Sequence, residues 1–452
     1  MAKYLLINPP CEVPDVKEYQ NKFVFKKNIS NWGISEDSQP LGLLKIASLL
    51  SGQQHNVKLI DCRSESKKRQ KNSIKNKTFV GFRNLGTSYK TKIRVNLHGM
   101  NYSDIKKSLI REKKPDKIYL TSMFTYNNKP LKNITDMCKE IFPDVPLILG
   151  GIFPTLCPES AKELNADQIY CGPYNKAFDA WSELGFLDYL PGYAAIKTSV
   201  GCPNNCSYCA TDKLEGRVMH FRDPCDVIEE IRDKISRHAI TRFTFWESNI
   251  LAGFKNHFEK ILDLLIKEKI NIELELPEGF QPNLITPQNA EKFRQAGLSY
   301  VQVPLDNTST YMKNKTGRPT GREETSKAIE NLKKAGFHRD KIYIVIMIGM
   351  PGQTMQEIID SIRFVWKQNC KLGINAYAPV PGTKMFKNHP GLHKTGYENL
   401  NPYLLPFANS KMDAYELMCI LAADNCTPVE YVRLMKNNKE FLHKVFTDRE
   451  LS

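Results

Sequence analysis

Three cysteines in a short window are the residues of this chain whose types and spacing best suit chemistry. Cys202, Cys206 and Cys209 follow the spacing C-x3-C-x2-C directly after the apolar, strand-like run 194–198. Glycine, proline and asparagine residues in this segment favour a tight loop, on which three thiolates can serve one inorganic centre. An iron–sulfur cube prefers four thiolates, so three leave one iron without a protein ligand. Such an open position is typical of a catalytic metal site rather than a structural one.

Other uses of these cysteines stay open from the residues alone. A structural zinc site needs a fourth ligand, and the nearest candidate is His220, eleven residues beyond Cys209. Disulfides fit worse, because three cysteines this close together cannot all pair with one another. The chain has 12 cysteines, and in a reducing compartment most of the others are expected to be buried thiols.

The cysteine spacing, with Tyr208 at an aromatic position, resembles the signature of the radical S-adenosylmethionine (SAM) enzymes. The resemblance covers residues 194–386. It implies that SAM chelates the fourth iron of a [4Fe-4S] cluster through its amino and carboxylate groups. It also implies that the reduced cluster splits the sulfonium and releases a 5′-deoxyadenosyl radical.

Strand and helix patterns alternate after the cysteine loop. They predict a partial (β/α)6 barrel, whose chemistry lies at the carboxyl ends of the strands. The predicted strands are 194–199, 241–246, 271–276, 299–304, 341–348 and 373–377. The predicted helices are 223–237, 254–268, 287–296, 323–335 and 355–369.

Glu247 ends the second predicted strand, where the radical SAM family uses a Gly-Gly-Glu turn. The resemblance implies that Glu247 meets the SAM ammonium. The two glycines are replaced here by Phe245 and Trp246, which puts the backbone contacts of that turn in doubt. A strand-end acid can also cap the following helix.

Other residues near the strand ends receive SAM-binding roles from the same resemblance. Glu278 closes the third predicted strand and Asp306 the fourth, and either acid is a candidate for the SAM ribose. Arg318 is a candidate for the SAM carboxylate. Gly349, after the fifth strand, would let the adenine approach the backbone closely.

Short apolar segments alternate with helical patterns in the N-terminal third as well. They predict a doubly wound, flavodoxin-like parallel sheet, on which ligands bind beyond the carboxyl ends of the strands. The strands are expected at 4–8, 57–61, 117–121, 146–149 and 167–171.

Ser122 and the pair Gly150-Gly151 follow neighbouring strands of that sheet. Paired glycines let a large flat ligand approach the backbone, although tight turns also use them. With residues 8–10 and 40–43 they resemble the cobalamin-binding domain of many radical SAM enzymes. The resemblance implies that the nucleotide tail of the corrin enters near Ser122, Gly150 and Gly151. The Asp-x-His-x-x-Gly loop of other cobalamin proteins is missing, so no histidine from that loop is expected on cobalt, and a domain that lost its ligand stays an alternative.

The length of 452 residues predicts several globular domains. We expect a cobalamin-binding-type domain at 1–190, the partial barrel at 191–388 and a short helical tail at 389–452. No segment approaches the ~20 continuous apolar residues of a membrane span. The apolar run at the N-terminus is too short for a signal peptide, so a soluble, cytoplasmic enzyme without membrane contact is expected.

The net charge of +15 is concentrated in residues 63–117, which hold 17 Lys and Arg against 4 Asp and Glu. A solvated basic insert is the commoner explanation of such a run. The run could instead dock an acidic electron donor such as a flavodoxin or ferredoxin, or RNA. No aromatic-interleaved basic sheet or RNA module is evident in the sequence, so nucleic acid is not favoured.

The two resemblances together imply a cobalamin-dependent radical SAM methyltransferase that acts on an unactivated carbon or phosphorus centre. One SAM would methylate cob(I)alamin, and a second would supply the radical that removes a substrate hydrogen. A radical cyclase or rearrangement enzyme is the main alternative, and a basic RNA-binding protein with a structural metal is another. A methylthiotransferase is disfavoured, because Cys11, Cys62 and Cys138 match its second cluster only loosely. The substrate, a small molecule or a peptide, is not readable from the sequence.

Overall fold

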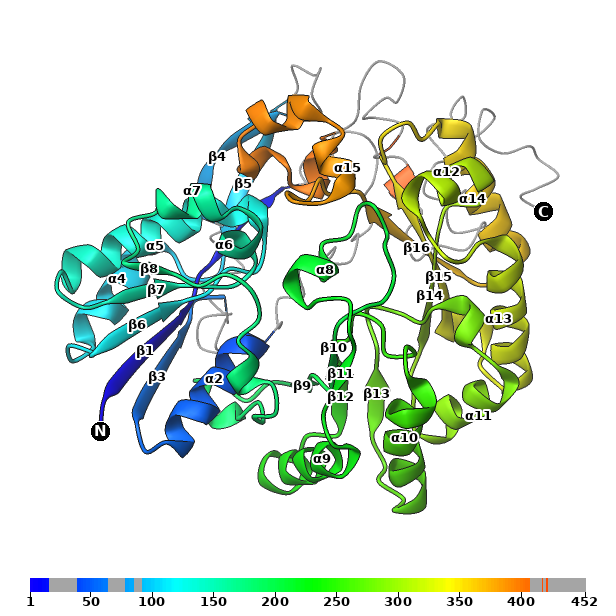
Figure 1. Ribbon diagram of the computed structural model, residues 1–452, viewed down its shortest axis with the longest axis horizontal. Helices are drawn as coiled ribbons and strands as arrows, with labels where there is room; N and C mark the ends of the chain where they lie inside the picture. Colours follow the sequence, from blue (N-terminus) through cyan, green and yellow to red (C-terminus); the bar gives the residue numbers. More distant parts are fainter. Residues whose placement is uncertain (16–38, 64–77, 85–91, 407–416, 418–419, 422–452) are drawn as a thin grey trace.

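The computed structural model describes residues 1–15, 39–63, 78–84, 92–406, 417, 420 and 421 (Figure 1). Two α/β units lie side by side: an N-terminal unit drawn in blue to cyan, and a second unit drawn in green to yellow. The expected change of domain near residue 190 falls just before the first strand of the second unit.

The N-terminal unit is built on a five-stranded parallel sheet with the order β3-β1-β6-β7-β8. This is the flavodoxin-like order of a doubly wound fold, so the predicted fold class is confirmed. Its strands are β1 (Lys3–Asn8), β3 (Asn56–Asp61), β6 (Lys117–Leu120), β7 (Leu147–Leu149) and β8 (Gln168–Ile169). Its helices are α2 (Leu41–Gly52), α4 (Tyr102–Arg111), α5 (Asn128–Ile141), α6 (Ile152–Leu156) and α7 (Pro158–Lys162).

Successive residues of β1 point to opposite faces of this sheet. Leu5 and Ile7 pack in one cluster with residues of α4 and α5. Leu6 packs in another cluster with residues of α2. A strand that is buried on both faces has no polar side to alternate with, which explains the continuous apolar runs in the sequence.

The described parts of the basic stretch 63–117 form regular elements. Strands β4 (Thr78–Asn84) and β5 (Lys92–His98) pair in an antiparallel sheet with β2 (Cys11–Pro14), and α4 follows. On β5 the apolar residues are buried and the basic ones are exposed. The exposed Phe79 lies under Arg94, with 4.9 Å from the guanidinium carbon to the ring centroid. Basic and aromatic side chains therefore do share a sheet face, which the sequence analysis did not foresee.

The second unit is a partial barrel of six parallel strands. Three strands pair in the order β13-β12-β9 and three in the order β14-β15-β16, and a parallel bridge from Leu274 to Leu298 joins the two groups. The strands are β9 (Ala194–Ile196), β12 (Arg242–Phe245), β13 (Glu273–Glu275), β14 (Val301–Asp306), β15 (Ile342–Ile348) and β16 (Lys371–Ala376). The crossover helices are α9 (Pro224–His238), α10 (Phe258–Lys267), α11 (Pro287–Gln295), α12 (Thr310–Thr316), α13 (Arg322–Lys334) and α14 (Met355–Lys367).

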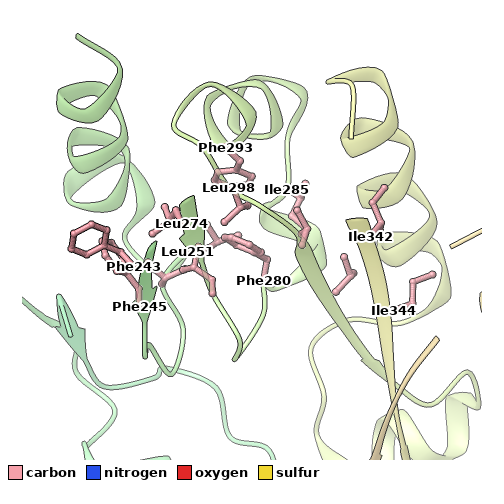
Figure 2. Close-up of a cluster of buried hydrophobic side chains, with 14 of the residues drawn as sticks. Phe243, Phe245, Leu251, Leu274, Phe280, Ile285, Phe293, Leu298, Ile342 and Ile344 are labelled. Carbon is pink, nitrogen blue, oxygen red and sulfur yellow. The ribbon is translucent and has the colours of Figure 1, made fainter. Parts of the chain in front are cut away.

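Apolar side chains between the strands and the outer helices fix the barrel (Figure 2). Phe243 and Phe245 of β12 are fully buried. Phe280 stacks on Phe293 of α11 with ring centroids 4.8 Å apart. Aromatic pairs of this kind add about 0.5–1.5 kcal/mol to the stability gained by burial. The packing holds the carboxyl ends of the strands at one mouth of the barrel.

Three short elements complete the mouth of the barrel. The antiparallel pair β10 (Ser199–Val200) and β11 (His220–Phe221) flanks the cysteine loop, and α8 (Thr211–Leu214) follows it. Helix α15 (Lys384–Lys387) comes after β16. In Figure 1, α8 lies between the N-terminal unit and the barrel.

The described part of the expected helical tail consists of short 3-10 helices at Pro390–Lys394, Tyr397–Asn399 and Pro402–Leu404. Leu417, Ile420 and Leu421 are helical and buried in the barrel core. The rest of the helices predicted after residue 410 lies outside the described residues. In the part of the chain that is described, no helix has the length and apolar character to cross a membrane.

Candidate cofactor and active site

The three clustered cysteines lie on the loop between β10 and α8 and line one cavity of about 250 Å³. This volume is several times the ~30 Å³ that one water occupies in the liquid. Backbone hydrogen bonds hold the loop in place: Ser207 N donates to Thr316 O at 2.7 Å, and Met385 N donates to Ser207 O at 2.8 Å. The loop is therefore tied to the ends of two barrel elements that are distant in sequence.

A glycine and a half-buried carboxylate shape the start of this loop. Gly201 has φ +101°, and a Cβ there would lie 2.3 Å from Val218 O, so no other residue fits without movement. Glu215 accepts hydrogen bonds from Gly201 N at 3.0 Å and from Ser248 Oγ at 2.8 Å. Lys197 Nζ lies 2.8 Å from Glu215 Oε1 and completes the arrangement.

The cysteine loop fits a cluster better than a single metal ion. Among the described residues, no three His, Cys, Asp or Glu side chains converge on a point where one ion would bind. The thiolates of a cube each ligate a different iron, so they need not meet at one point. Three soft sulfur ligands around one cavity are suited to iron–sulfur chemistry. Burial raises the pKa of the Cys206 thiol, and Arg318 opposes this effect.

Two residues predicted to contact SAM, Asp306 and Arg318, contact each other and Tyr208 of the cysteine loop at the end of β14. Asp306 Oδ2 accepts a hydrogen bond from the Tyr208 phenol. Arg318 Nε lies 3.5 Å from the same oxygen, and Arg318 Nη1 donates to the Tyr208 oxygen at 3.3 Å. Burial works against the charge of Arg318, but Asp306 and Tyr208 outweigh it and raise the pKa of the guanidinium. Burial and then Asp306 raise the pKa of Tyr208 well above its usual value, so the phenol stays a donor.

Glu247 is buried and holds the chain that leads into the cysteine loop. Its carboxylate accepts hydrogen bonds from Thr198 N at 2.5 Å, Ser199 N at 3.0 Å and Ser199 Oγ at 2.5 Å. This role was missed from the sequence, because it joins residues of two different strand ends. The predicted contact with the SAM ammonium stays a prediction.

Gly349 lies in the loop after β15 with φ +76°. A Cβ there would have no neighbouring atom within 4 Å, so the backbone at this position faces open space. A flat ring would therefore have room to lie against the backbone at Gly349. The adenine contact itself stays a prediction. Met350 is buried with Met312 and Tyr377.

Ser122, Gly150 and Gly151 meet at the carboxyl ends of β6 and β7. Ser122 Oγ donates to Gly150 O at 3.1 Å and accepts from Phe153 N at 2.8 Å. Gly151 has φ +94°, and a Cβ there would lie 2.4 Å from Ser122 O. The serine hydroxyl thus holds the glycine turn, and its expected hydrogen bond to a corrin tail stays a prediction.

A second cavity of about 850 Å³ lies between the two units. Met123, Phe124 and Tyr126 line it from the end of β6, and side chains of β14, β15 and β16 line it from the barrel. Tyr208 and Cys209 line both this cavity and the cysteine cavity. The volume lies within the ~300–1,000 Å³ of typical ligand sites.

The aromatic lining of this larger cavity was missed from the sequence. Tyr343, Val345 and Met347 alternate along β15 and all line the cavity. Met347 also packs against the buried cluster of Met312, Met350, Tyr377 and Met385. The two-residue period of a barrel strand was the available signal, because every second side chain of such a strand points inward.

Family models match both units of the chain. The model of the radical SAM superfamily matches residues 196–365, and the model of the B12 binding domain matches residues 80–182. The second match includes residues 80–84 of β4 and all of β5 and α4, so the basic stretch overlaps the B12 binding domain.

Curated relatives by sequence are methylthiotransferases. The chain is 23% identical over 210 residues to the ribosomal protein uS12 methylthiotransferase RimO of Thermoanaerobacter sp. (strain X514), covering 45% of this chain and 47% of the relative. It is 26% identical over 255 residues to the tRNA-2-methylthio-N(6)-dimethylallyladenosine synthase of Clostridium novyi (strain NT), covering 52% and 53%. The chain thus spans about half the length of the curated relatives that it matches.

Solved structures share the fold over most of the chain. The radical SAM methyltransferase TsrM from Kitasatospora setae, with cobalamin and a [4Fe-4S] cluster bound, has a TM-score of 0.60 and 15% identity, covering 85% of this chain and 77% of that chain. The cobalamin-dependent SAM radical enzyme OxsB has a TM-score of 0.54 and 13% identity, covering 99% and 62%.

The observations from the cysteine loop, the parallel sheet and the family models agree. A three-cysteine loop at the mouth of a partial barrel fits a [4Fe-4S] cluster with SAM, and the flavodoxin-like unit fits cobalamin. The chain carries a radical SAM domain preceded by a B12 binding domain.

Proposed function

We propose that this enzyme transfers a methyl group to an unactivated carbon or phosphorus centre with the help of cobalamin. The observation that carries the proposal is the larger cavity, which borders Cys209 and also the strand ends of the B12 binding domain. A substrate in this cavity would lie within reach of both cofactors. Holding the substrate beside both cofactors converts a reaction between separate molecules into a reaction within one complex.

The chemistry requires the cofactors, because a positioned acid or base contributes only ~10²–10⁴-fold and is too weak to remove a hydrogen from an sp³ carbon. Bound cluster and SAM supply a hydrogen-abstracting radical, and bound cobalamin supplies a transferable methyl group. The protein's own residues bind, orient and exclude water. Tyr208, Asp306 and Arg318 form a fixed polar wall beside the cluster loop, and apolar side chains such as Ile152 and Leu156 line the cavity.

Methylthiotransfer is the second candidate, because the curated relatives carry that name. Such a reaction would need a second cluster in the N-terminal unit. Cys11 and Cys138 are buried, and burial raises the pKa of both thiols, that of Cys138 to about 12. These observations favour methyl transfer.

The test is anaerobic purification and reconstitution with iron, sulfide and hydroxocobalamin, followed by reduction and SAM labelled with deuterium in its methyl group. We expect the protein to retain the corrinoid, to release 5′-deoxyadenosine and to form labelled methylcobalamin, which mass spectrometry detects without a known substrate. Deoxyadenosine without methylcobalamin would instead support a cyclase or rearrangement enzyme. A second iron–sulfur cluster in the N-terminal unit would support methylthiotransfer.

A further inference from the structure

We infer that the substrate is an organic amine, whose protonated nitrogen pairs with Glu278 inside the larger cavity. The inference deepens the proposed function, because it takes this cavity as the place where the substrate binds. Glu278 follows β13 at the barrel mouth, in the segment between β13 and Phe280.

Glu278 is the single acidic or basic side chain among the described residues that line this cavity. Its carboxylate makes no hydrogen bond to any residue in the described part of the chain, and its surface is open to the cavity. Glu247 and Asp306, the other acids considered for SAM, each hold protein donors instead. A carboxylate held ready inside an otherwise uncharged cavity selects for a positive ligand.

The charges around Glu278 leave a surplus of negative charge. Lys197 is the cation that acts on Glu278, and it also faces Glu215 and Glu247. Lys197 Nζ donates hydrogen bonds to Glu215 Oε1 and to Trp246 O, each at 2.8 Å. One ammonium therefore faces three carboxylates. Desolvation by the surrounding protein raises the pKa of Glu278 although the side chain is exposed to the cavity, and a second cation beside it would lower the pKa again.

The rest of the cavity surface suits the organic body of an amine. Tyr300, Tyr343 and Tyr377 line it, and Tyr300 meets Tyr343 edge to face with centroids 5.8 Å apart. Aromatic faces attract ammonium groups and pack on apolar carbon. Gln302 and Asn375 add neutral hydrogen-bonding groups. A cationic nitrogen on an apolar or aromatic body matches these features together, whereas an anionic phosphate or carboxylate would face Glu278 without a counter-charge.

The experiment uses the full-length, cofactor-loaded protein and a matched pair of probes. Tyramine carries an ammonium, and tyrosol has the same phenol with a neutral hydroxyl. We expect calorimetry at pH 7 to give tyramine at least a tenfold lower Kd than tyrosol. Glu278→Gln should bring the two Kd values within about twofold of each other. The control Glu273→Gln changes an exposed acid on β13 and should keep the wild-type preference.

Measuring the Kd of SAM distinguishes a role of Glu278 in binding the substrate from a role in binding SAM. We expect Glu278→Gln to bind SAM with the wild-type Kd and to keep its iron and corrinoid content. Equal affinity for the two probes in the wild type, no measurable tyramine binding, or a loss of SAM affinity in Glu278→Gln would overturn the inference. Because these are binding measurements, a failure to form methylcobalamin would contradict the proposed function without changing the outcome here.

Discussion

The phenol of Tyr208 donates a hydrogen bond to Asp306 across 98 residues of sequence. Tyr208 precedes the third cluster cysteine, and Asp306 is the last residue of β14. Asp306 has φ +63°, a conformation that non-glycine residues adopt at a cost of about 1–3 kcal/mol. Tyr208 and Arg318 together hold it there, so the cysteine loop and the barrel mouth are one connected polar structure.

Tyr208→Phe should weaken SAM binding without removing the cluster. The change leaves Asp306 with Arg318 as its remaining partner in this group, and hydrogen bonds to charged groups contribute about 1.5–3 kcal/mol. We expect a stability loss of that order in urea unfolding and a roughly tenfold rise in the Kd of SAM. Iron content should stay at the wild-type level. Tyr311→Phe, at an exposed tyrosine, is the control; an unchanged Kd for Tyr208→Phe would contradict the role given to this contact.

Cys206→Ala should abolish the cluster, because two thiolates cannot hold the cube. We expect the anaerobically reconstituted variant to lose the broad visible absorption, most of its iron and all SAM cleavage. Cys225→Ala is the matched control, since Cys225 is also accessible but lies at the start of α9. A Cys206→Ala protein that assembles its native centre would refute the assignment of the cluster loop.

Gly151→Ala should destabilise the B12 binding domain. The new Cβ would lie 2.4 Å from Ser122 O, and the residue would keep a positive φ of 94°. We expect a loss of about 1–3 kcal/mol in unfolding free energy. At the neighbouring Gly150 a Cβ would have its nearest atom at 3.9 Å, so Gly150→Ala should unfold like the wild type. If both variants unfold alike, the steric reading of this turn is wrong.

His257 should make the protein less stable in mild acid. Its ring is buried beside Phe221, with centroids 4.8 Å apart, and burial lowers its pKa to about 4 from the 6.5 of the free side chain. Between pH 6.5 and pH 4 the His257 imidazole is protonated in the unfolded chain but neutral in the folded chain. The free energy of unfolding therefore falls as pH falls from 6.5 towards 4. The expected contribution between pH 7 and pH 5 is about 2 kcal/mol. Urea unfolding at pH 7 and at pH 5 gives the fall in unfolding free energy between the two pH values. In His257→Asn this fall should be smaller than in the wild type by about 2 kcal/mol. Equal falls in the two proteins would contradict the prediction.

Most strands and helices were predictable from the sequence, because both units consist of buried parallel strands. Such strands appear as short apolar runs, and the observed bounds differ from the predicted ones by a few residues, as for β15 and α9. Helix α12 was missed: its sequence, TYMKNKT, is short and polar and shows little periodicity. The β4–β5 pair was missed although Ile93, Val95 and Leu97 alternate with polar residues as in a half-exposed strand, because the positive charge of this stretch was attributed to a solvated insert.

The cysteine loop was predictable because its chemistry is local in sequence. The group of Tyr208, Asp306 and Arg318 was not, since its members come together only when the barrel closes. Asp306 and Arg318 were predicted to contact SAM, yet their contacts with Tyr208 join segments about 100 residues apart in the sequence. The same reason hid the hydrogen bonds from Glu247 to the segment before the loop.

Tyr208 and Cys209 form a wall shared by the two cavities. Whatever fills the larger cavity therefore also shields one side of the iron–sulfur centre from dissolved oxygen. The lifetime of the centre in air should consequently lengthen when corrinoid and substrate are both present. An enzyme built in this way keeps its most fragile component best protected while it is working.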